Sequence, residues 1–245
     1  MTKILWAANV LRDAGVEVYE MPGWKDSETR PGFDVNGIVC HHTATGPNWQ
    51  DGHVALLLRR GRSDLSGPLS QFGLERDGTW VCIAAGRCNH NGYGVWGNDS
   101  IGIEAYNNGK GEVWPDAQME SYGVGVAALC EKTGLSIAEV RGHKETDPTR
   151  KIDPTFNMDN FRVQVNKIMV PIPIPIPSPT AKGDDVFLVT QKKTGNMWLM
   201  EEGRRALVPS GEETLAKNSD IPYLGEVSDP FFGRLGADRK VYQEG

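Results

Sequence analysis

The chain of 245 residues carries a formal net charge of −6, and its residues are 39% hydrophobic and 24% charged. This is the composition of an ordinary globular protein, and the length allows one sizeable core with room for a small second domain. The acidic balance argues against nucleic-acid binding, which normally requires a basic patch. No stretch approaches the roughly 20 apolar residues of a membrane span, so membrane insertion is not expected.

The N-terminus predicts a helix rather than an export signal. Ile4, Ala8 and Leu11 recur at helical spacing, and Gly15 ends the pattern. Asn9 interrupts the apolar stretch, and a cleavage site of the A-x-A type is absent. We therefore expect a protein without a signal peptide that is made in the cytoplasm and would need another route to an extracytoplasmic substrate.

The segments up to residue 170 predict an α/β domain. Apolar runs and turn residues give the expected elements in chain order: a strand over 37–40, a helix over 52–61, a hairpin over 72–83 around Asp77-Gly78, a strand over 100–105, a helix after Pro115, a strand over 137–141 and a helix over 159–169. Strands that alternate with helices predict a mixed central β-sheet flanked by helices.

A proline-rich stretch separates this domain from the rest. Proline occupies every second position of residues 171–179, which excludes a helix and a paired central strand and favours a stiff polyproline-II spacer. We therefore expect a first domain over residues 1–170, a linker over 171–181 and a second domain over 182–245. A proline-rich ligand for a recognition module is the alternative reading of the linker.

Residues 182–245 predict a small β-rich domain. Strand-like runs at 186–189 and 197–200 flank a turn-rich segment and could form a hairpin, and residues 209–217 could form one short helix. About 64 residues is near the lower limit for folding without disulfides or a metal. The aromatic side chains of this segment are interpreted as core rather than as a binding platform.

The four cysteines are interpreted as buried free thiols. Cys40, Cys82, Cys88 and Cys130 form no C-x-x-C pair, and Cys40 and Cys82 lie in apolar, strand-like runs. A zinc site built from these cysteines is not expected.

Histidines at the ends of two apolar runs indicate a metal site instead. Residues 38–40 lead into His41 and His42, a second apolar run leads into His143, and Asp153 follows ten residues later. Two imidazoles and one carboxylate are the ligands of an open, hydrolytic zinc site. Because side chains alternate along a strand, only one of His41 and His42 can face such a site, and the other is expected to be structural.

Lys151 and Asp153 lie two positions apart, so their side chains point the same way if the segment is extended. Pro154 favours an extended conformation at Asp153. Asp153 could then bind a metal while Lys151 reaches a substrate beside it. A surface ion pair between the two is the alternative.

Five segments carry a more specific signal because of their order. They are residues 38–44 (IVCHHTA), the hairpin over 72–80 with its Arg-Asp-Gly-Thr turn, residues 89–92 (NHNG), residues 100–105 (SIGIEA), and residues 142–153, which begin Gly-His-Lys-Glu and end Lys-x-Asp. This series resembles the zinc-dependent N-acetylmuramoyl-L-alanine amidases, the family shared by phage lysins and peptidoglycan recognition proteins. The resemblance covers about residues 20–165 and implies that family's fold.

The resemblance also implies roles for particular residues. His41, His143 and Asp153 correspond to the zinc ligands, and the chain matches the aspartate-bearing members better than the cysteine-bearing ones. Glu104 corresponds to a glutamate that is the catalytic base in some members, although a buried ion pair is its alternative role. Lys151 is expected to stabilise the oxyanion that forms when the amide is attacked.

The segment over 89–92 corresponds to one that lines the family's cleft. His90 and Asn91 are therefore expected to contact substrate, with a solvated loop as the alternative for His90. Glu145 could support a zinc-bound imidazole. One departure concerns residues 70–72, which are Ser-Gln-Phe where several phage members have Tyr-His-Phe; the tyrosine proposed as a catalytic donor there is absent.

The activity implied is hydrolysis of the amide bond between N-acetylmuramic acid and the L-alanine of the stem peptide, with Zn²⁺ as cofactor and cell-wall peptidoglycan as partner. The expected setting is a phage endolysin, held in the host cytoplasm until lysis, whose second domain binds the wall. A recognition protein that binds peptidoglycan without cutting it and a cytosolic amidase that recycles muropeptides are the alternatives.

Overall fold

The computed structural model describes residues 3–169 and, beyond them, the strands over 186–191, 197–201, 204–207 and 223–227. The chain forms two compact units, Met1–Val170 and Pro171–Gly245. Each unit is described by itself.

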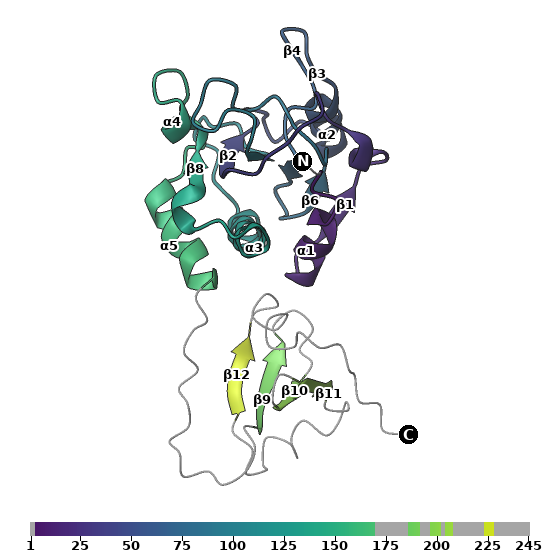
Figure 1. The fold of residues 1–245 in the computed structure, drawn as a ribbon. Coiled ribbons are helices and arrows are strands. Elements are labelled where there is room, and N and C mark those ends of the chain that lie inside the picture. The colour runs from purple at the N-terminus through teal and green to yellow at the C-terminus, as the bar shows by residue number, and fades with distance from the viewer. Residues whose placement is uncertain (1–2, 170–185, 192–196, 202–203, 208–222, 228–245) are drawn as a thin grey trace. The chain divides into compact units, whose positions relative to one another are not determined.

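The first unit combines helices with a central sheet (Figure 1). Its helices are α1 (Ala7–Asp13), α2 (Asp51–Arg60), α3 (Asp116–Thr133), α4 (His143–Thr146) and α5 (Met158–Met169), with 3₁₀ turns η1 (Trp24–Asp26) and η2 (Ile137–Glu139). Its strands are β1 (Val18–Glu20), β2 (Ile38–His42), β3 (Gly61–Arg62), β4 (Leu65–Ser66), β5 (Phe72–Leu74), β6 (Trp80–Cys82), β7 (Ile101–Ala105) and β8 (Val140–Gly142).

Six of these strands form one sheet in the order β1-β6-β5-β7-β2-β8. The β5–β6 hairpin is antiparallel, and every other neighbouring pair is parallel. The mixed central sheet expected from the sequence is therefore confirmed. Because β2, β5, β7 and β8 run in the same direction, the loops that follow them leave from one edge of the sheet.

One face of the sheet packs against helices. Figure 1 shows α1, α3 and α5 on this side of the sheet and α2 with the β3–β4 hairpin on the other. Phe72 and Trp80 stand on this face with ring centroids 5.4 Å apart, and Tyr122 of α3 lies 6.3 Å from Trp80. All three side chains are fully buried. Gly125 of α3 is required here, because a Cβ at this position would lie 2.1 Å from Trp80.

The opposite face of the sheet carries the polar residues that matter for function. Residues paired in register on adjacent strands share a face. Glu104 of β7 is the register partner of both His41 on β2 and Gly73 on β5. The side chains of His41 and Glu104 therefore stand next to each other, on the side of the sheet away from Phe72.

The expected elements of the first unit are largely confirmed, with one correction and several omissions. The hairpin over 72–83 and the strands over 37–40 and 100–105 are present. The strand expected over 137–141 is wrong in its first half, because Ser136 caps a 3₁₀ turn with a capping box to Glu139. The elements that were not expected from the sequence are β1, η1, α4 and the short β3–β4 hairpin.

In the second unit the described strands form a four-stranded sheet in the order β11-β10-β9-β12. They are β9 (Val186–Gln191), β10 (Met197–Glu201), β11 (Arg204–Leu207) and β12 (Tyr223–Val227). β9 and β10 pair antiparallel, as expected for a hairpin, and β12 pairs parallel with β9. The linker over 171–181 and the helix expected over 209–217 lie outside the described residues.

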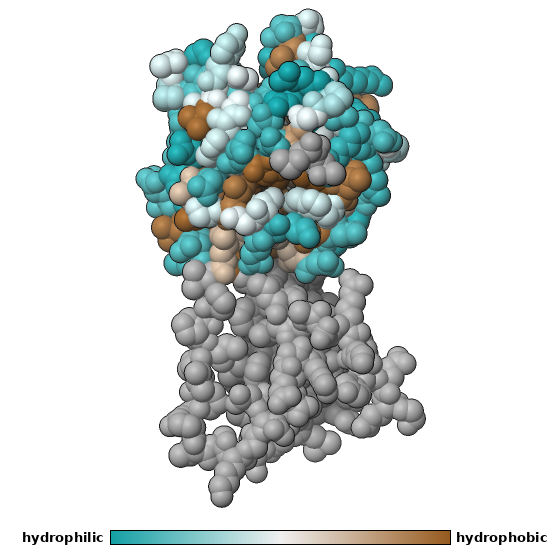
Figure 2. Space-filling model, viewed as in Figure 1, coloured by the Kyte–Doolittle hydropathy of each residue, from teal (hydrophilic) through white to brown (hydrophobic). Residues whose placement is uncertain are grey.

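The surface seen in Figure 2 is largely hydrophilic over the first unit, with a band of hydrophobic residues across its middle. No helix among the described residues is both long and apolar enough to cross a bilayer.

All four cysteines are buried and free, as expected.

Candidate functional site

Three residues that the sequence analysis singled out come together beyond the edge of the sheet. His41 is the fourth residue of β2, His143 opens the short helix α4 directly after β8, and Asp153 lies in the segment between α4 and α5. One ligand atom from each residue lies within 4.8 Å of the other two. Parallel pairing of β2 with β8 accounts for this, since it brings the ends of the two histidine-bearing strands side by side.

The three side chains converge through specific atoms. The Oδ2 atom of Asp153 lies 3.1 Å from Nδ1 of His41 and 3.2 Å from Nδ1 of His143. The two imidazole rings are 4.4 Å apart between centroids and meet edge to face. Both histidines are buried, and the Asp153 side chain is only 14% exposed.

The charge states of these groups suit a bound cation. Burial lowers the pKa of His41 to about 4, so its imidazole is neutral near pH 7. Burial alone would raise the pKa of Asp153, but its contacts with His143 and His41 hold that pKa well below the usual range. Two imidazole nitrogens and an ionised carboxylate oxygen therefore face one point, and zinc takes this combination of ligands.

Glu104 stands beside this cluster with an unusual carboxyl group. Its Oε2 atom is buried and has no hydrogen-bond partner among the described residues. The pKa of Glu104 is raised to about 8, mainly by burial and in part by the nearby carboxylate of Asp153, against the opposing charges of Lys151 and Arg62. A carboxyl group with its pKa near neutrality is suited to accept and release protons.

Lys151 lies in the same segment as Asp153, two positions before it. Lys151 and Asp153 are each partly buried, whereas Ile152 between them is 74% exposed. The alternation shows that Lys151 and Asp153 point to the same side. The positive charge of Lys151 lowers the pKa of both His41 and Glu104.

The side chains of His90 and Asn91 both make polar contacts with other residues of the protein. Nδ1 of His90 lies 3.0 Å from Nε2 of His41, and its Nε2 lies 2.9 Å from the carbonyl oxygen of Ser100. Asn91 is fully buried, donates to the carbonyl oxygens of Val95 and Gly97, and accepts from the hydroxyl of Thr146. Contact of either residue with substrate stays a prediction.

His42 and Glu145 lie outside the cluster. The ring of His42 is 6.4 Å from that of Trp114, and it fills the space in front of Gly109, where a Cβ would lie 2.2 Å from His42 Nε2. Glu145 accepts from the backbone N–H of Gly142 and forms an ion pair with Arg162. Nε2 of His41 does not face Asp153. It contacts His90, not Glu145.

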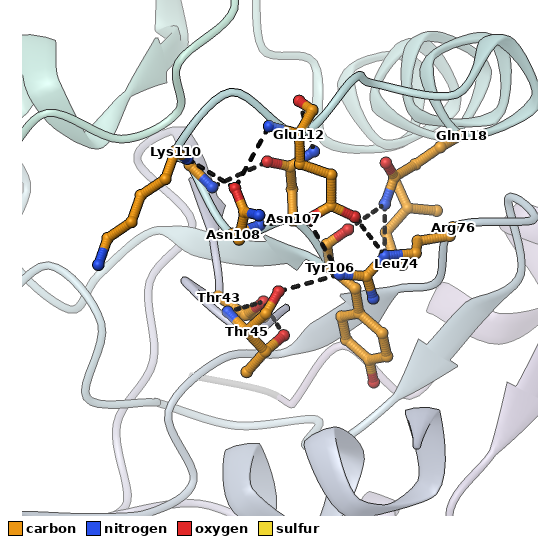
Figure 3. A network of polar contacts seen from close by, with 11 residues as sticks. Thr43, Thr45, Leu74, Arg76, Tyr106, Asn107, Asn108, Lys110, Glu112 and Gln118 are labelled. Atoms are coloured by element: carbon orange, nitrogen blue, oxygen red, sulfur yellow. Dashed lines mark hydrogen bonds and ion pairs between the residues drawn. The ribbon is translucent and has the colours of Figure 1, made fainter. Parts of the chain in front are cut away.

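A polar network holds the loops around the site in place (Figure 3). Arg76, in the β5–β6 turn, donates to Glu112 through two nitrogens at 2.6 and 3.3 Å and to the carbonyl oxygen of Thr45 at 2.9 Å. Gln118 of α3 donates to the carbonyl oxygens of Leu74 and Tyr106, each at 3.1 Å. The loops that follow β2, β5 and β7 are thereby tied together.

Two features of the site were not expected from the sequence. Arg62, whose charge lowers the pKa of Glu104, belongs to the β3–β4 hairpin that the sequence analysis missed. In place of the histidine of the Tyr-His-Phe pattern, Gln71 bridges two backbone groups: it accepts from the N–H of Gly102 at 2.7 Å and donates to the carbonyl oxygen of Gly86 at 2.9 Å. Ser70, at the position of the absent tyrosine, is fully buried.

Comparison with protein families matches residues 31–156 to the family described as N-acetylmuramoyl-L-alanine amidase. A search of curated protein sequences finds no match. Among solved structures, the amidase LysC from Clostridium intestinale URNW is similar with a TM-score of 0.50 at 21% identity, over 61% of this chain and 97% of that one. The endolysin LysCS from the same organism gives 0.49 at 20% identity, over 61% and 95%. A structure of AmpD gives 0.46 at 22% identity, over 61% and 93%.

Proposed function

Because the chain belongs to the N-acetylmuramoyl-L-alanine amidase family, we propose that it is a zinc-dependent hydrolase of the amide bond between N-acetylmuramic acid and L-alanine in peptidoglycan. The observation that carries this proposal is the convergence of His41, His143 and Asp153 at the edge of the sheet, where Glu104 is the register neighbour of His41. A binding protein that does not cut would have no need of a carboxyl group with a raised pKa at this position.

His41, His143 and Asp153 would hold the ion through the three atoms that converge. Bound there, Zn²⁺ supplies Lewis acidity toward a carbonyl oxygen and toward water. Three protein ligands leave a coordination position open, which is typical of hydrolytic rather than structural zinc sites.

Glu104 and Lys151 supply the remaining chemistry. The Glu104 carboxylate takes a proton from the attacking water and returns it to the amine of L-alanine as that group leaves. Its unpartnered Oε2 atom is free to make this contact. Lys151, whose charge reaches Glu104, stabilises the negative charge that develops on the carbonyl oxygen.

A measurement of zinc content together with a product assay tests this function. Wild-type protein should bind about one zinc ion and release amino groups of L-alanine from purified cell walls, and the His143→Ala variant should lose both properties. Replacement of His53, an exposed residue of α2, is the matched control for loss of a histidine. Full activity of a zinc-free His143→Ala protein would overturn the proposal.

We propose further that the natural substrate is the polymeric wall, as for an endolysin, rather than a soluble muropeptide. The support is a second unit with its own four-stranded sheet, which a wall-binding arm could use to raise the local enzyme concentration. Sedimentation of inactive His143→Ala protein with purified walls tests this, with a chain ending at residue 170 for comparison. Equal binding by both chains, or a higher kcat/KM on soluble muropeptides than on walls, would favour the recycling alternative.

A further inference from the structure

A chain of three polar contacts leads from the backbone to the candidate metal position. The carbonyl oxygen of Ser100 lies 2.9 Å from Nε2 of His90, Nδ1 of His90 lies 3.0 Å from Nε2 of His41, and Nδ1 of His41 lies 3.1 Å from Oδ2 of Asp153. The two imidazoles meet edge to face, with their planes at 85°. Each ring nitrogen of both histidines therefore has one defined neighbour.

The positions of the protons follow from the chemistry of these groups. A carbonyl oxygen only accepts hydrogen bonds, so Nε2 of His90 must carry a proton and donate to Ser100. The ring is buried and its polar contacts among the described residues are the neutral Ser100 carbonyl and the His41 ring, so the neutral form is favoured and its Nδ1 is an acceptor. The hydrogen bond between the rings is then donated by Nε2 of His41, which leaves the Nδ1 lone pair of His41 unprotonated.

The ring of His90 is held in the orientation that this scheme requires. It lies against Gly102 of β7, where an added Cβ would be 2.7 Å from the Cγ and Nδ1 atoms of His90. The backbone N–H of His90 donates to the side chain of Asn98 at 3.1 Å. Only 9% of the residue is exposed, so water cannot readily replace either of its ring contacts.

We propose that His90 is a positioning residue that selects the Nε2-protonated tautomer of His41 and so keeps the Nδ1 atom of His41 available to a metal ion. Metal-bound histidines usually donate their other N–H to a carboxylate, a carbonyl or water, and loss of such a partner typically lowers metal affinity about 10–100-fold. Here a second neutral imidazole, itself fixed by a backbone carbonyl, is that partner. The inference rests on the proposed zinc site but assigns His90 a role that does not involve substrate.

Nuclear magnetic resonance tests the tautomers directly. Long-range ¹H–¹⁵N correlation spectra of the zinc-loaded full chain, labelled at its five histidines, distinguish protonated from unprotonated ring nitrogens. We expect a proton on Nε2 and none on Nδ1 in both His41 and His90. A proton on Nδ1 of His41, with zinc bound through Nε2, would overturn the inference.

Zinc affinity, measured by competition with a chelator, tests the consequence. We expect the dissociation constant of His90→Leu to rise about 10–100-fold, whereas His90→Asn, whose carbonyl oxygen can accept from His41, should stay closer to wild type. His53→Leu is the control. Circular dichroism must show that the variants are folded, and if His90→Leu does not fold, the wild-type spectra still decide.

Gly102→Ala provides a test that keeps the histidine. Its added Cβ should displace the His90 ring and lower zinc affinity without removing any titratable group. Wild-type affinity in His90→Leu and Gly102→Ala would refute the positioning role while leaving the zinc site intact. Failure of the wild-type protein itself to bind zinc would instead refute the proposed function.

Discussion

Glu104 is the direct neighbour of His41 across two parallel strands, since the two residues are register partners on β7 and β2. This pairing fixes the carboxyl group beside the candidate metal-binding atoms through backbone geometry rather than through a side-chain contact. The proposed base and one proposed metal ligand therefore keep their separation as long as the two central strands stay paired.

The first expectation concerns this carboxyl group. Glu104→Gln keeps the shape of the side chain but cannot accept a proton, so kcat should fall about 10²–10⁴-fold while zinc content is unchanged. Glu120→Gln, at an exposed position of α3, is the control. A Glu104→Gln enzyme with kcat within a factor of about ten of wild type would exclude Glu104 as the base.

A second expectation concerns the charge of Lys151. That charge lowers the pKa of Glu104, so Lys151→Met should raise this pKa and move the acidic limb of the kcat/KM profile to higher pH. A loss of about 10²-fold in kcat should accompany the shift if Lys151 also stabilises the oxyanion. Lys110 is an exposed lysine in the loop after β7, and Lys110→Met should change neither the acidic limb nor kcat. If the acidic limb of Lys151→Met stays where it is in the wild type, the charge of Lys151 does not reach Glu104.

Stability should depend on pH through Glu75. The pKa of this residue is raised from 4.5 to about 7, mainly by burial and in part by the charges of Asp51 and Asp77. The folded state then holds the proton more tightly than the unfolded state, so the contribution of Glu75 to stability is full below about pH 4.5 and is lost as the pH rises through about 7.

Glu75→Gln should therefore raise the free energy of unfolding at pH 8, by about 1 kcal/mol after allowance for solvent screening, and should have little effect at pH 4. Urea denaturation at the two pH values measures the difference. Glu131→Gln, at an exposed site on α3, serves as the comparison. The same change in the free energy of unfolding at both pH values would mean that the ionisation of Glu75 is not its cause.

Two glycines in helices should respond in opposite ways to alanine. A Cβ at Gly125 of α3 would lie 2.1 Å from the ring of Trp80, whereas one at Gly52 of α2 would meet nothing within 4 Å. Gly125→Ala should lower the free energy of unfolding by about 1–3 kcal/mol because of overpacking. Gly52→Ala should be neutral or stabilising by about 0.5 kcal/mol through helix propensity.

Thermal melting of both variants is the measurement. A stabilised Gly125→Ala protein would mean that the sheet and α3 can separate enough to admit a methyl group. Such a result would also weaken the view of this face as a closely packed support for the site.

Much of the central sheet could be predicted because its strands are apolar runs bounded by turn residues. The hairpin around Asp77-Gly78 is the clearest example. β1 has only three residues and lies at the edge of the sheet, and β3 and β4 have two residues each. Segments so short carry no periodicity, so their pairing partners, not their own sequences, determine them.

The candidate site, too, could be predicted only in part from the sequence. His41, His143 and Asp153 could be predicted together, because the two histidines follow apolar runs and all three residues match an ordered motif. The placement of His90 could not, because its ring contacts His41 across 49 positions of sequence and depends on the space left by Gly102. Periodicity cannot show that a histidine in a loop segment is buried and that both of its nitrogens are engaged.

The segment that carries His143 and Asp153 is closed by the protein's own hydrogen bonds. The backbone N–H of Lys144 donates to the carbonyl oxygen of Asp153 at 2.7 Å, and the ammonium of Lys144 donates to the carbonyl oxygens of Pro154 and Phe156. These hydrogen bonds hold the two ends of this segment together whether or not an ion is bound. Exchange of the ion should then require only side-chain motion, so that chelation and reloading can be repeated without refolding the chain.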